Sequence, residues 1–355
     1  MAADNTGGQY SVFRALLGLA LLVQFAALLP TGGELFPAAL APGIAGGVLV
    51  AALVAALALA AGCWDRVAAL LLVVVWTSLF VHAPLDEALG ALAVALLLVL
   101  HALQPRAPYG SLAARGRVDP GNAWRPTRWC FGALWSVMAI GYSASAVLQI
   151  ERAGWTATSA LLLLFAPLAL WRRARPWLWL TLVGVHVVQI ARGDLVELRV
   201  GLLLLHAATF DPAWVRARRP ERPERLFYDG GCGVCHGFVR FLLSEDPEGR
   251  AVRFAPLDSD SFRAHVPAAQ RDALPDSVVL QRHDGELLMR TAAVVHLLRA
   301  LGGIWGLLGC ALACVPRPLR DAAYDGFARV RHRVAKAPDA ACPLLPPELA
   351  ARFEH

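Results

Sequence analysis

The chain has 355 residues, of which 57% are hydrophobic and 17% are charged. A soluble protein carries about 25% charged residues, so this composition excludes a wholly soluble chain and indicates that much of it lies in lipid. The net charge of +6 arises from arginine, since Lys336 is the single lysine. No basic patch interleaved with aromatic residues occurs, which argues against nucleic acid as a partner.

The first 215 residues are typical of a bundle of membrane-spanning helices. Apolar segments of spanning or near-spanning length recur there, and the first has neither the basic flank nor the cleavage site of a signal peptide. We predict eight helices, at residues 12–29, 44–62, 66–81, 85–103, 129–148, 156–170, 177–190 and 195–210. Several are shorter than about 20 residues, so tilted, re-entrant or interfacial segments remain alternatives.

The loops between these segments indicate an orientation. Arginines crowd the loop after the fourth segment, the loop after the sixth and the stretch after the eighth, whereas the opposite loops are poor in arginine. By the positive-inside rule, the arginine-rich loops and both termini are cytoplasmic. We therefore expect an integral, multi-pass protein of a bacterial inner membrane with a cytoplasmic C-terminal domain.

Four polar side chains inside the predicted spans are candidates for a membrane site. His186 and Gln189 share a face of the seventh segment, and Glu197 and His206 lie in the eighth. Polar groups in lipid are costly, so each is a functional hypothesis by default. Hydrogen bonding and ion pairing between helices are the alternative explanation.

Three blocks of this half carry a resemblance, namely SVFRALLGLALLVQFAALLP, GYSASAVLQIERAGW and LLHAATFDPAWV. They resemble the horizontally transferred transmembrane family, which is related to the membrane part of vitamin K-dependent gamma-carboxylase. The resemblance implies an all-helical membrane domain. Carboxylases of this kind use a lysine base in that domain, and residues 1–215 contain no lysine. We therefore expect the fold to carry over and the carboxylation reaction not to.

Residues 216–224 form a charged, proline-punctuated linker, and residues 225–355 mix polar and apolar residues as an α/β domain does. We predict a strand at 226–228, a helix after it, a strand at 252–257 and a partly helical stretch at 261–273. Strands at 277–281 and 286–289 flank an Asp-Gly turn, and a helix follows at 292–301. This order is typical of a thioredoxin-like domain.

The stretch RLFYDGGCGVCHGFVRFLLS places Cys232 and Cys235 in a C-x-x-C spacing at the start of the predicted helix. The helix dipole and the free N–H groups of the first turn stabilise a thiolate there. We expect Cys232 to be a partly exposed nucleophile that attacks a substrate disulfide. Cys235, one turn later, would resolve the mixed disulfide.

Neighbouring residues are expected to support this dithiol. Tyr228 ends the preceding strand, and Asp229 is either the proton acceptor for Cys235 or a solvated turn residue. The glycines of the turn would let the backbone of a partner chain come close, and these are Gly230, Gly231 and Gly233.

Three other interpretations of the motif remain. With His236, it also spells C-x-x-C-H, the haem attachment pattern, although haem is attached on the outer side of the membrane and the loops place the motif inside. A zinc site would need further ligands, and no second C-x-x-C follows with zinc-ribbon spacing. The third alternative is a surface turn without chemistry.

Residues 225–345 resemble, block by block, the DCC family of predicted thiol-disulfide oxidoreductases. The blocks are LFYDGGCGVCHGFVRFL, VRFAPLDSD, LPDSVVLQRHDGELLMRTAAVVHLLRALGGIW, VPRPLRDAAYDGFARVRHRV and Cys342-Pro343. The family signature Asp-x-x-Cys-x-x-Cys falls on Asp229, Cys232 and Cys235. Late in the domain the family has a pattern similar to A-x-N-R-Y, whereas this chain has ARVRH at 328–332. The resemblance therefore assigns no role to that segment.

We thus predict an α-helical membrane domain joined to a thioredoxin-like domain that acts as a protein-disulfide reductase. Its redox-active cysteine pair needs no other cofactor and no metal. Its partners would be the lipid bilayer, a disulfide-bearing protein or small thiol, and an unidentified electron donor. Two alternatives are a lipid- or quinone-modifying membrane enzyme with the dithiol domain as its reductant, and a non-catalytic membrane interaction module.

Overall fold

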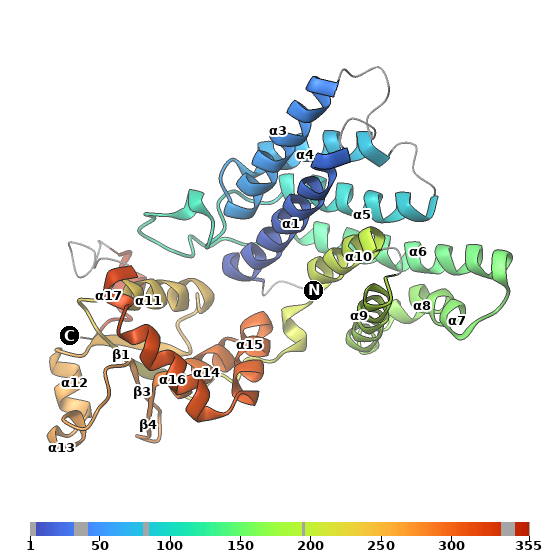
Figure 1. Cartoon of the computed structure of the whole chain (residues 1–355). Coiled ribbons are helices and arrows are strands. Elements are labelled where there is room, and N and C mark those ends of the chain that lie inside the picture. Colours follow the sequence, from blue (N-terminus) through green and yellow to red (C-terminus); the bar gives the residue numbers. More distant parts are fainter. Residues whose placement is uncertain (1–4, 32–41, 81–84, 194–195, 335–344, 355) are drawn as a thin grey trace.

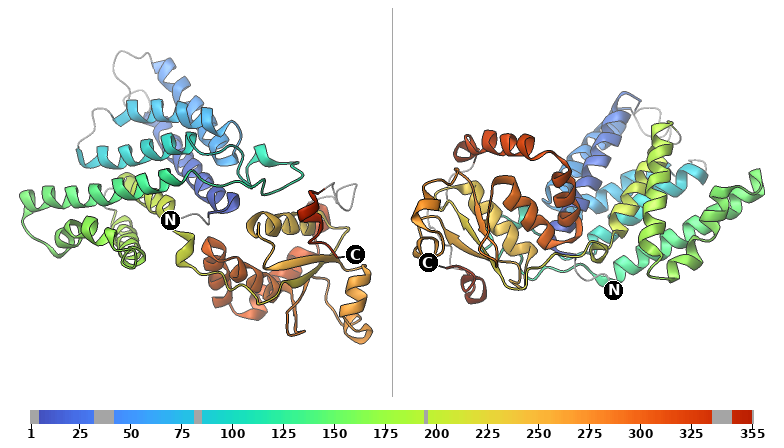
Figure 2. Two further views of the ribbon diagram at one scale, coloured as in Figure 1. Left: turned by 180° about the vertical axis from the view of Figure 1, so that it is seen from behind. Right: turned by 90° about the horizontal axis from the view of Figure 1, so that it is seen from below.

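The computed structural model describes residues 5–31, 42–80, 85–193, 196–334 and 345–354. The chain is mostly helical, with a small mixed four-stranded sheet in its C-terminal region (Figure 1). The N-terminal helices form one group, and the sheet with its flanking helices forms a second group beside it (Figure 2). The strands all lie in the C-terminal region, where the sequence predicts an α/β domain.

All eight segments that we predict as spans are helical, and the sixth holds two helices, α7 and α8. Their bounds are α1 Gly7–Leu28, α3 Pro42–Ala61, α4 Asp65–Phe80, α5 Leu85–Ala102, α6 Arg128–Ala153, α7 Ala157–Leu163, α8 Phe165–Leu170, α9 Arg175–Ala191 and α10 Val196–Thr209. Short 3₁₀ turns lie at Leu29–Thr31, Leu112–Ala114 and Pro212–Trp214. Within the described residues, three helices are long and apolar enough to cross a membrane, at Gly7–Leu28, Gly43–Ala61 and Arg128–Arg152. They suggest membrane association; the count of eight spans is not confirmed.

The sixth predicted span is wrong as a single helix, because it is broken at Leu164 into α7 and α8. Pro167 cannot donate a backbone hydrogen bond, and its ring displaces the carbonyl four residues earlier. The hydroxyl of Ser143 on α6 fills the break: it donates to the carbonyls of Leu162 and Leu163, at 3.1 and 3.0 Å, and accepts from the N–H of Ala166 at 3.1 Å. Neither short helix is long enough to cross a bilayer.

Small residues let the first two long helices pack closely. Gly18 of α1 lies against the backbone of Ala60 on α3, where an added Cβ would stand 2.5 Å from the Ala60 nitrogen. Leu17 and Phe25 are fully buried on this side, while Val23 on the opposite side of α1 is 69% exposed. Close backbone approach through small residues is how helices associate in lipid, where the outer face stays apolar.

The C-terminal elements follow the predicted order. They are β1 Glu224–Tyr228, α11 Gly233–Glu245, β2 Val252–Pro256, α12 Asp260–His265, α13 Ala268–Arg271, β3 Val279–Gln281, β4 Leu287–Met289, α14 Arg290–Leu301, α15 Gly303–Cys314, α16 Arg317–Ala328, α17 Arg331–Val334 and α18 Pro347–Ala350. The sheet order is β2-β1-β3-β4, with β1 parallel to β2 and the other pairs antiparallel. Strand β1 is therefore central and is covered on both faces, by Val239 and Leu242 of α11 on one and Phe262 of α12 on the other.

The two parts of the chain meet where α11 ends. Glu245, the last residue of α11, accepts hydrogen bonds from the hydroxyl of Thr6, from the Gly8 N–H at 3.0 Å and from the Trp305 indole N–H at 2.6 Å. Burial raises the pKa of the Glu245 carboxyl, and these hydrogen bonds oppose that rise. The helix that begins at the C-x-x-C thus ends against the start of α1.

Candidate functional site

The dithiol lies where the central strand β1 gives way to α11. Cys232 is the N-cap residue of α11, with extended backbone angles, and its Sγ accepts a hydrogen bond from the Cys235 N–H at 3.3 Å. The sulfur therefore occupies the place that a serine or aspartate oxygen takes at most helix starts. A negative charge on this sulfur would be stabilised by that N–H and by the dipole of α11.

Both cysteines are buried, with 0% of Cys232 and 6% of Cys235 exposed. The prediction of a partly exposed Cys232 is therefore wrong. The physical reason is that Cys232 lies in the core cluster of Tyr228 and Val239, and that α17 packs against α11 with Arg331 close to both cysteines. A short motif cannot reveal a cover that lies about a hundred residues further along.

Burial raises the pKa of Cys235 to about 12, and the hydrogen bond and charge of Cys232 add to the effect. The guanidinium of Arg331 opposes this rise, and the carboxylate of Asp229 supports it. Cys235 therefore keeps its proton across the physiological range in the reduced site, while its backbone N–H serves the sulfur of Cys232.

Asp229 is held by an ion pair and is not a freely solvated turn residue. Its Oδ1 accepts from the Gly231 N–H at 2.8 Å, and its Oδ2 lies 3.1 Å from Nη2 of Arg331. Arg331 is 4% exposed and also donates to Oδ1 of Asp276 at 2.6 Å. Both cysteines and both carboxylates raise the pKa of this guanidinium, against an opposing effect of burial.

Sequence reasoning misses Arg331, because it lies in the segment ARVRH that departs from the family pattern. The available signal is that the arginine of A-x-N-R-Y is retained at position 331. Tyr324 is missed as well: its hydroxyl accepts from the Val278 N–H at 3.2 Å, and burial with the nearby Cys235 raises its pKa. Each contact joins segments more than 40 residues apart, and no local pattern encodes it.

The turn itself is held by His236, whose Nε2 bonds the carbonyl of Gly230 at 2.8 Å and whose ring packs edge-on against Tyr228. None of Gly230, Gly231 and Gly233 has a positive φ, so the turn does not require the special conformations of glycine. Their role in admitting a partner chain stays a prediction. Over the described parts of the chain, no three His, Cys, Asp or Glu side chains are grouped closely enough to hold a metal.

Two of the four membrane candidates meet through a third residue. The hydroxyl of Tyr142 on α6 bonds Nε2 of His186 at 2.6 Å and Nε2 of His206 at 2.9 Å, and all three side chains are buried. His186 and His206 are thus joined by a tyrosine that sequence reasoning misses. Gln189 lies near the end of α9, and the side chain of Glu197 lies outside the described residues.

Comparisons with known proteins bear on the C-terminal region. The model of the family "DCC1-like thiol-disulfide oxidoreductase" matches residues 226–337. The chain is 31% identical over 132 residues to "Uncharacterized protein YuxK" of Bacillus subtilis, a match covering 36% of this chain and 91% of that protein. It is 30% identical over 115 residues to "DCC family protein At1g52590, chloroplastic" of Arabidopsis thaliana, covering 32% and 64% of the two chains. No solved structure matches the chain. The resemblance of residues 1–215 to the gamma-carboxylase relatives is not confirmed and stays a prediction.

Proposed function

The C-terminal region of this chain carries a DCC1-like thiol-disulfide oxidoreductase domain and belongs to that family, and on this premise we propose that the chain is a membrane-bound thiol-disulfide oxidoreductase. Exchange takes place at Cys232 and Cys235 in a thioredoxin-like domain at residues 225–355, which the helices of residues 1–215 hold at the membrane. The observation that carries the proposal is the hydrogen bond from the Cys235 N–H to Cys232 Sγ at the start of a 13-residue helix.

The reaction proceeds in two exchanges. The thiolate of Cys232 attacks one sulfur of a substrate disulfide; a Cys232–substrate disulfide forms and the other substrate sulfur leaves as a thiolate. Cys235 then gives up its proton and attacks Cys232 Sγ, which forms the Cys232–Cys235 disulfide and releases the second substrate sulfur. Two electrons pass from the dithiol to the substrate, and an electron donor of the cell must reduce the new disulfide.

The groups around Cys235 favour the second exchange, in which this cysteine loses its proton and attacks the mixed disulfide. Its high pKa holds the proton until the mixed disulfide has formed and the negative charge has left Cys232. Asp229 is close enough to act on Cys235, and its side chain is 29% exposed, so a proton taken there can pass to water. Arg331, paired with Asp229, stabilises the negative charge that develops on the cysteine sulfurs.

Access to the buried Cys232 requires movement of the elements that cover it. Helix α17 has four residues and packs against α11, so its displacement loses little apolar packing. It also breaks the ion pairs of Arg331, so α17 must close again before Arg331 can stabilise the charge on the sulfurs. The substrate is therefore a disulfide on a flexible protein segment or a small molecule, able to enter a narrow opening. With the domain on the cytoplasmic side, the direction of exchange is that of a reductase.

The test uses the full chain in detergent with insulin as the disulfide substrate and dithiothreitol as reductant. Cys232→Ser is expected to abolish turnover. In a separate incubation without dithiothreitol, Cys235→Ser is expected to trap a mixed disulfide with insulin, which added dithiothreitol then releases. Cys310→Ser, which removes an exposed cysteine, is the matched control and should turn over normally. Turnover by Cys232→Ser, or no trapped species with Cys235→Ser, would contradict the proposal.

A further inference from the structure

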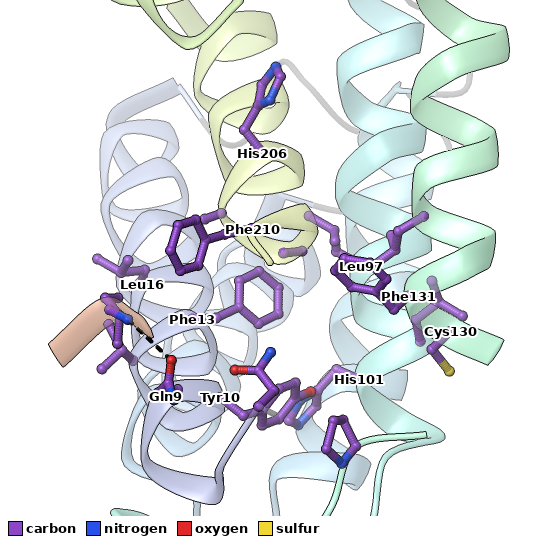
Figure 3. Close-up of a pocket in the computed structure, with 18 of the residues that line it drawn as sticks. Gln9, Tyr10, Phe13, Leu16, Leu97, His101, Cys130, Phe131, His206 and Phe210 are labelled. Atoms are coloured by element: carbon purple, nitrogen blue, oxygen red, sulfur yellow. Dashed lines mark hydrogen bonds between the residues drawn. The ribbon is translucent and has the colours of Figure 1, made fainter. Parts of the chain in front are cut away.

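A cavity of about 270 Å³ lies among α1, α5, α6, α9 and α10, and Ile304 and Leu307 of α15 complete its wall (Figure 3). It therefore lies between the apolar helices and the dithiol domain, away from the cysteine pair. Most of its lining is apolar and aromatic, from Phe13, Leu97 and Phe131 among others. Pockets for drug-sized ligands have volumes of about 300–1,000 Å³, so this one suits a smaller molecule with an apolar body.

One end of the cavity is polar. Tyr10 and His101 line it and face each other, with 2.6 Å between the Tyr10 hydroxyl and His101 Nδ1 (Figure 3). Behind them, Oδ2 of Asp65 lies 3.6 Å from Nε2 of His101. Tyr10 and His101 are more than nine-tenths buried, and the side chain of Asp65 is 13% exposed. Trp124 packs on the Tyr10 ring, with 5.0 Å between ring centroids, and holds it in place.

The direction of the Tyr10–His101 hydrogen bond follows from the charge of the nearby carboxylate, which at 3.6 Å from Nε2 is too far away for a hydrogen bond of its own. Asp65 can only accept, so it favours the imidazole form with the proton on Nε2, which leaves Nδ1 of His101 as an acceptor. Tyr10 must then donate its single hydroxyl proton to His101. The Tyr10 oxygen retains lone pairs but has no further proton to give, so a ligand at this end must supply the donor.

The wall from the dithiol domain is anchored beside this polar end. Gln9 directly precedes Tyr10 in the chain, and its Oε1 accepts a hydrogen bond from the Ile304 N–H at 3.2 Å. The cavity is thus closed on this side by α15, whose own exposed face is apolar at Leu307 and Leu308. The mostly apolar lining offers few partners for a charge, which favours an uncharged molecule.

We propose that this cavity binds a small, uncharged ring compound with one hydroxyl group, which donates a hydrogen bond to Tyr10 while its ring contacts Phe13 and Phe131. The aromatic walls favour a flat ring over a single acyl chain, because stacked and edge-on ring contacts add to simple burial. The site does not use Cys232 or Cys235, and its occupancy is independent of thiol exchange.

The probe is 2-naphthol, a fluorescent two-ring phenol, added to the full chain in lipid nanodiscs, with empty nanodiscs correcting for partition into lipid. We expect saturable binding at one site per chain. The methyl ether 2-methoxynaphthalene has the same ring but no donor, and should bind about five- to tenfold more weakly, the value of one hydrogen bond. Equal binding of the two probes would overturn the assigned chemistry, and no saturable binding of 2-naphthol would overturn the site.

Two variants locate the probe. Ala207 lines the cavity, so Ala207→Phe fills it and should weaken 2-naphthol binding by about tenfold or more. Leu19 on α1 is 48% exposed and does not line the cavity, so Leu19→Phe is the matched control and should change affinity by less than about twofold. Equal losses in both variants would place the probe elsewhere and overturn the proposal.

Discussion

The dithiol site and the interior of the N-terminal helices both bury polar groups, but they differ in charge. At the dithiol, Arg331 is paired with two carboxylates, and one of them, Asp276, has a side chain that is 70% exposed. Among the helices, Tyr142 joins His186 and His206 through hydrogen bonds that need no net charge. At the dithiol site the buried guanidinium thus has a partner that reaches water, which matters because burying an ion costs far more than burying a hydrogen-bonded neutral group.

Charge does occur in the N-terminal half at helix ends. Arg14 is 1% exposed and donates to backbone carbonyls at the end of α3, including that of Ala60 at 2.8 Å. The negative end of the helix dipole and the unsatisfied carbonyls there offset the cost of burying the guanidinium. The difference between the two regions thus lies in how each charge is compensated.

Of the substitutions considered, removal of the Arg331 guanidinium should reduce stability and exchange rate the most. Arg331→Met leaves Asp229 and Asp276 without their cation, and breaking a buried ion pair costs about 3–5 kcal/mol. Because both carboxylates are partly hydrated, we expect about 2–3 kcal/mol of lost stability in urea denaturation of the full chain, with thiol exchange slowed by about tenfold.

Arg329→Met is the matched control, since Arg329 is exposed two residues earlier. Its stability and exchange rate should stay near those of the parent chain. Equal effects of the two substitutions would show that Arg331 has no special part in the dithiol site.

Substitution of Glu245, where the two parts of the chain meet, should reduce stability by an intermediate amount. Glu245→Leu leaves Trp305 and the Gly8 N–H without an acceptor, which outweighs the gain from removing a buried charge. We expect about 2 kcal/mol of lost protection, read as faster hydrogen exchange in the peptide that begins at Asn5.

The same carboxyl predicts a pH dependence. Its folded pKa is raised above the ordinary 4.5, so the unfolded chain loses this proton at a lower pH than the folded chain does. The stabilisation is complete below pH 4.5 and falls as pH rises through the folded pKa, by about 1.4 kcal/mol per pH unit within that window. Glu245→Gln should remove this decline, and an unchanged pH profile would refute the assignment.

Removal of the Tyr142 hydroxyl, which joins two uncharged imidazoles, should reduce stability the least. Tyr142→Phe takes away one hydroxyl and leaves two imidazole nitrogens to find other partners. Hydrogen bonds among membrane helices are worth about 0.6 kcal/mol on average, so we expect about 1 kcal/mol of lost thermal stability. A loss as large as that of Arg331→Met would remove the distinction between the two regions.

Much of the fold could be predicted from the sequence because it depends on local patterns. Apolar runs predict the helices of the N-terminal half, and the strand, turn and helix around Cys232 follow from short signals of glycine and alternating hydrophobicity. The break at Leu164 could be suspected from Pro167, but Ser143, which fills it, comes from another helix. The exact pairing of polar groups is a property of packing.

The sequence by itself determined where the dithiol lies and that it stands at the start of a helix, because four neighbouring residues specify both. Only the tertiary structure decided what surrounds it. Arg331 reaches Asp229 across 102 positions of the chain, α17 packs against α11, and Glu245 joins the far end of α11 to Thr6. Such contacts form when distant segments fold onto one core, and their cost and benefit depend on burial and charge that no short motif contains.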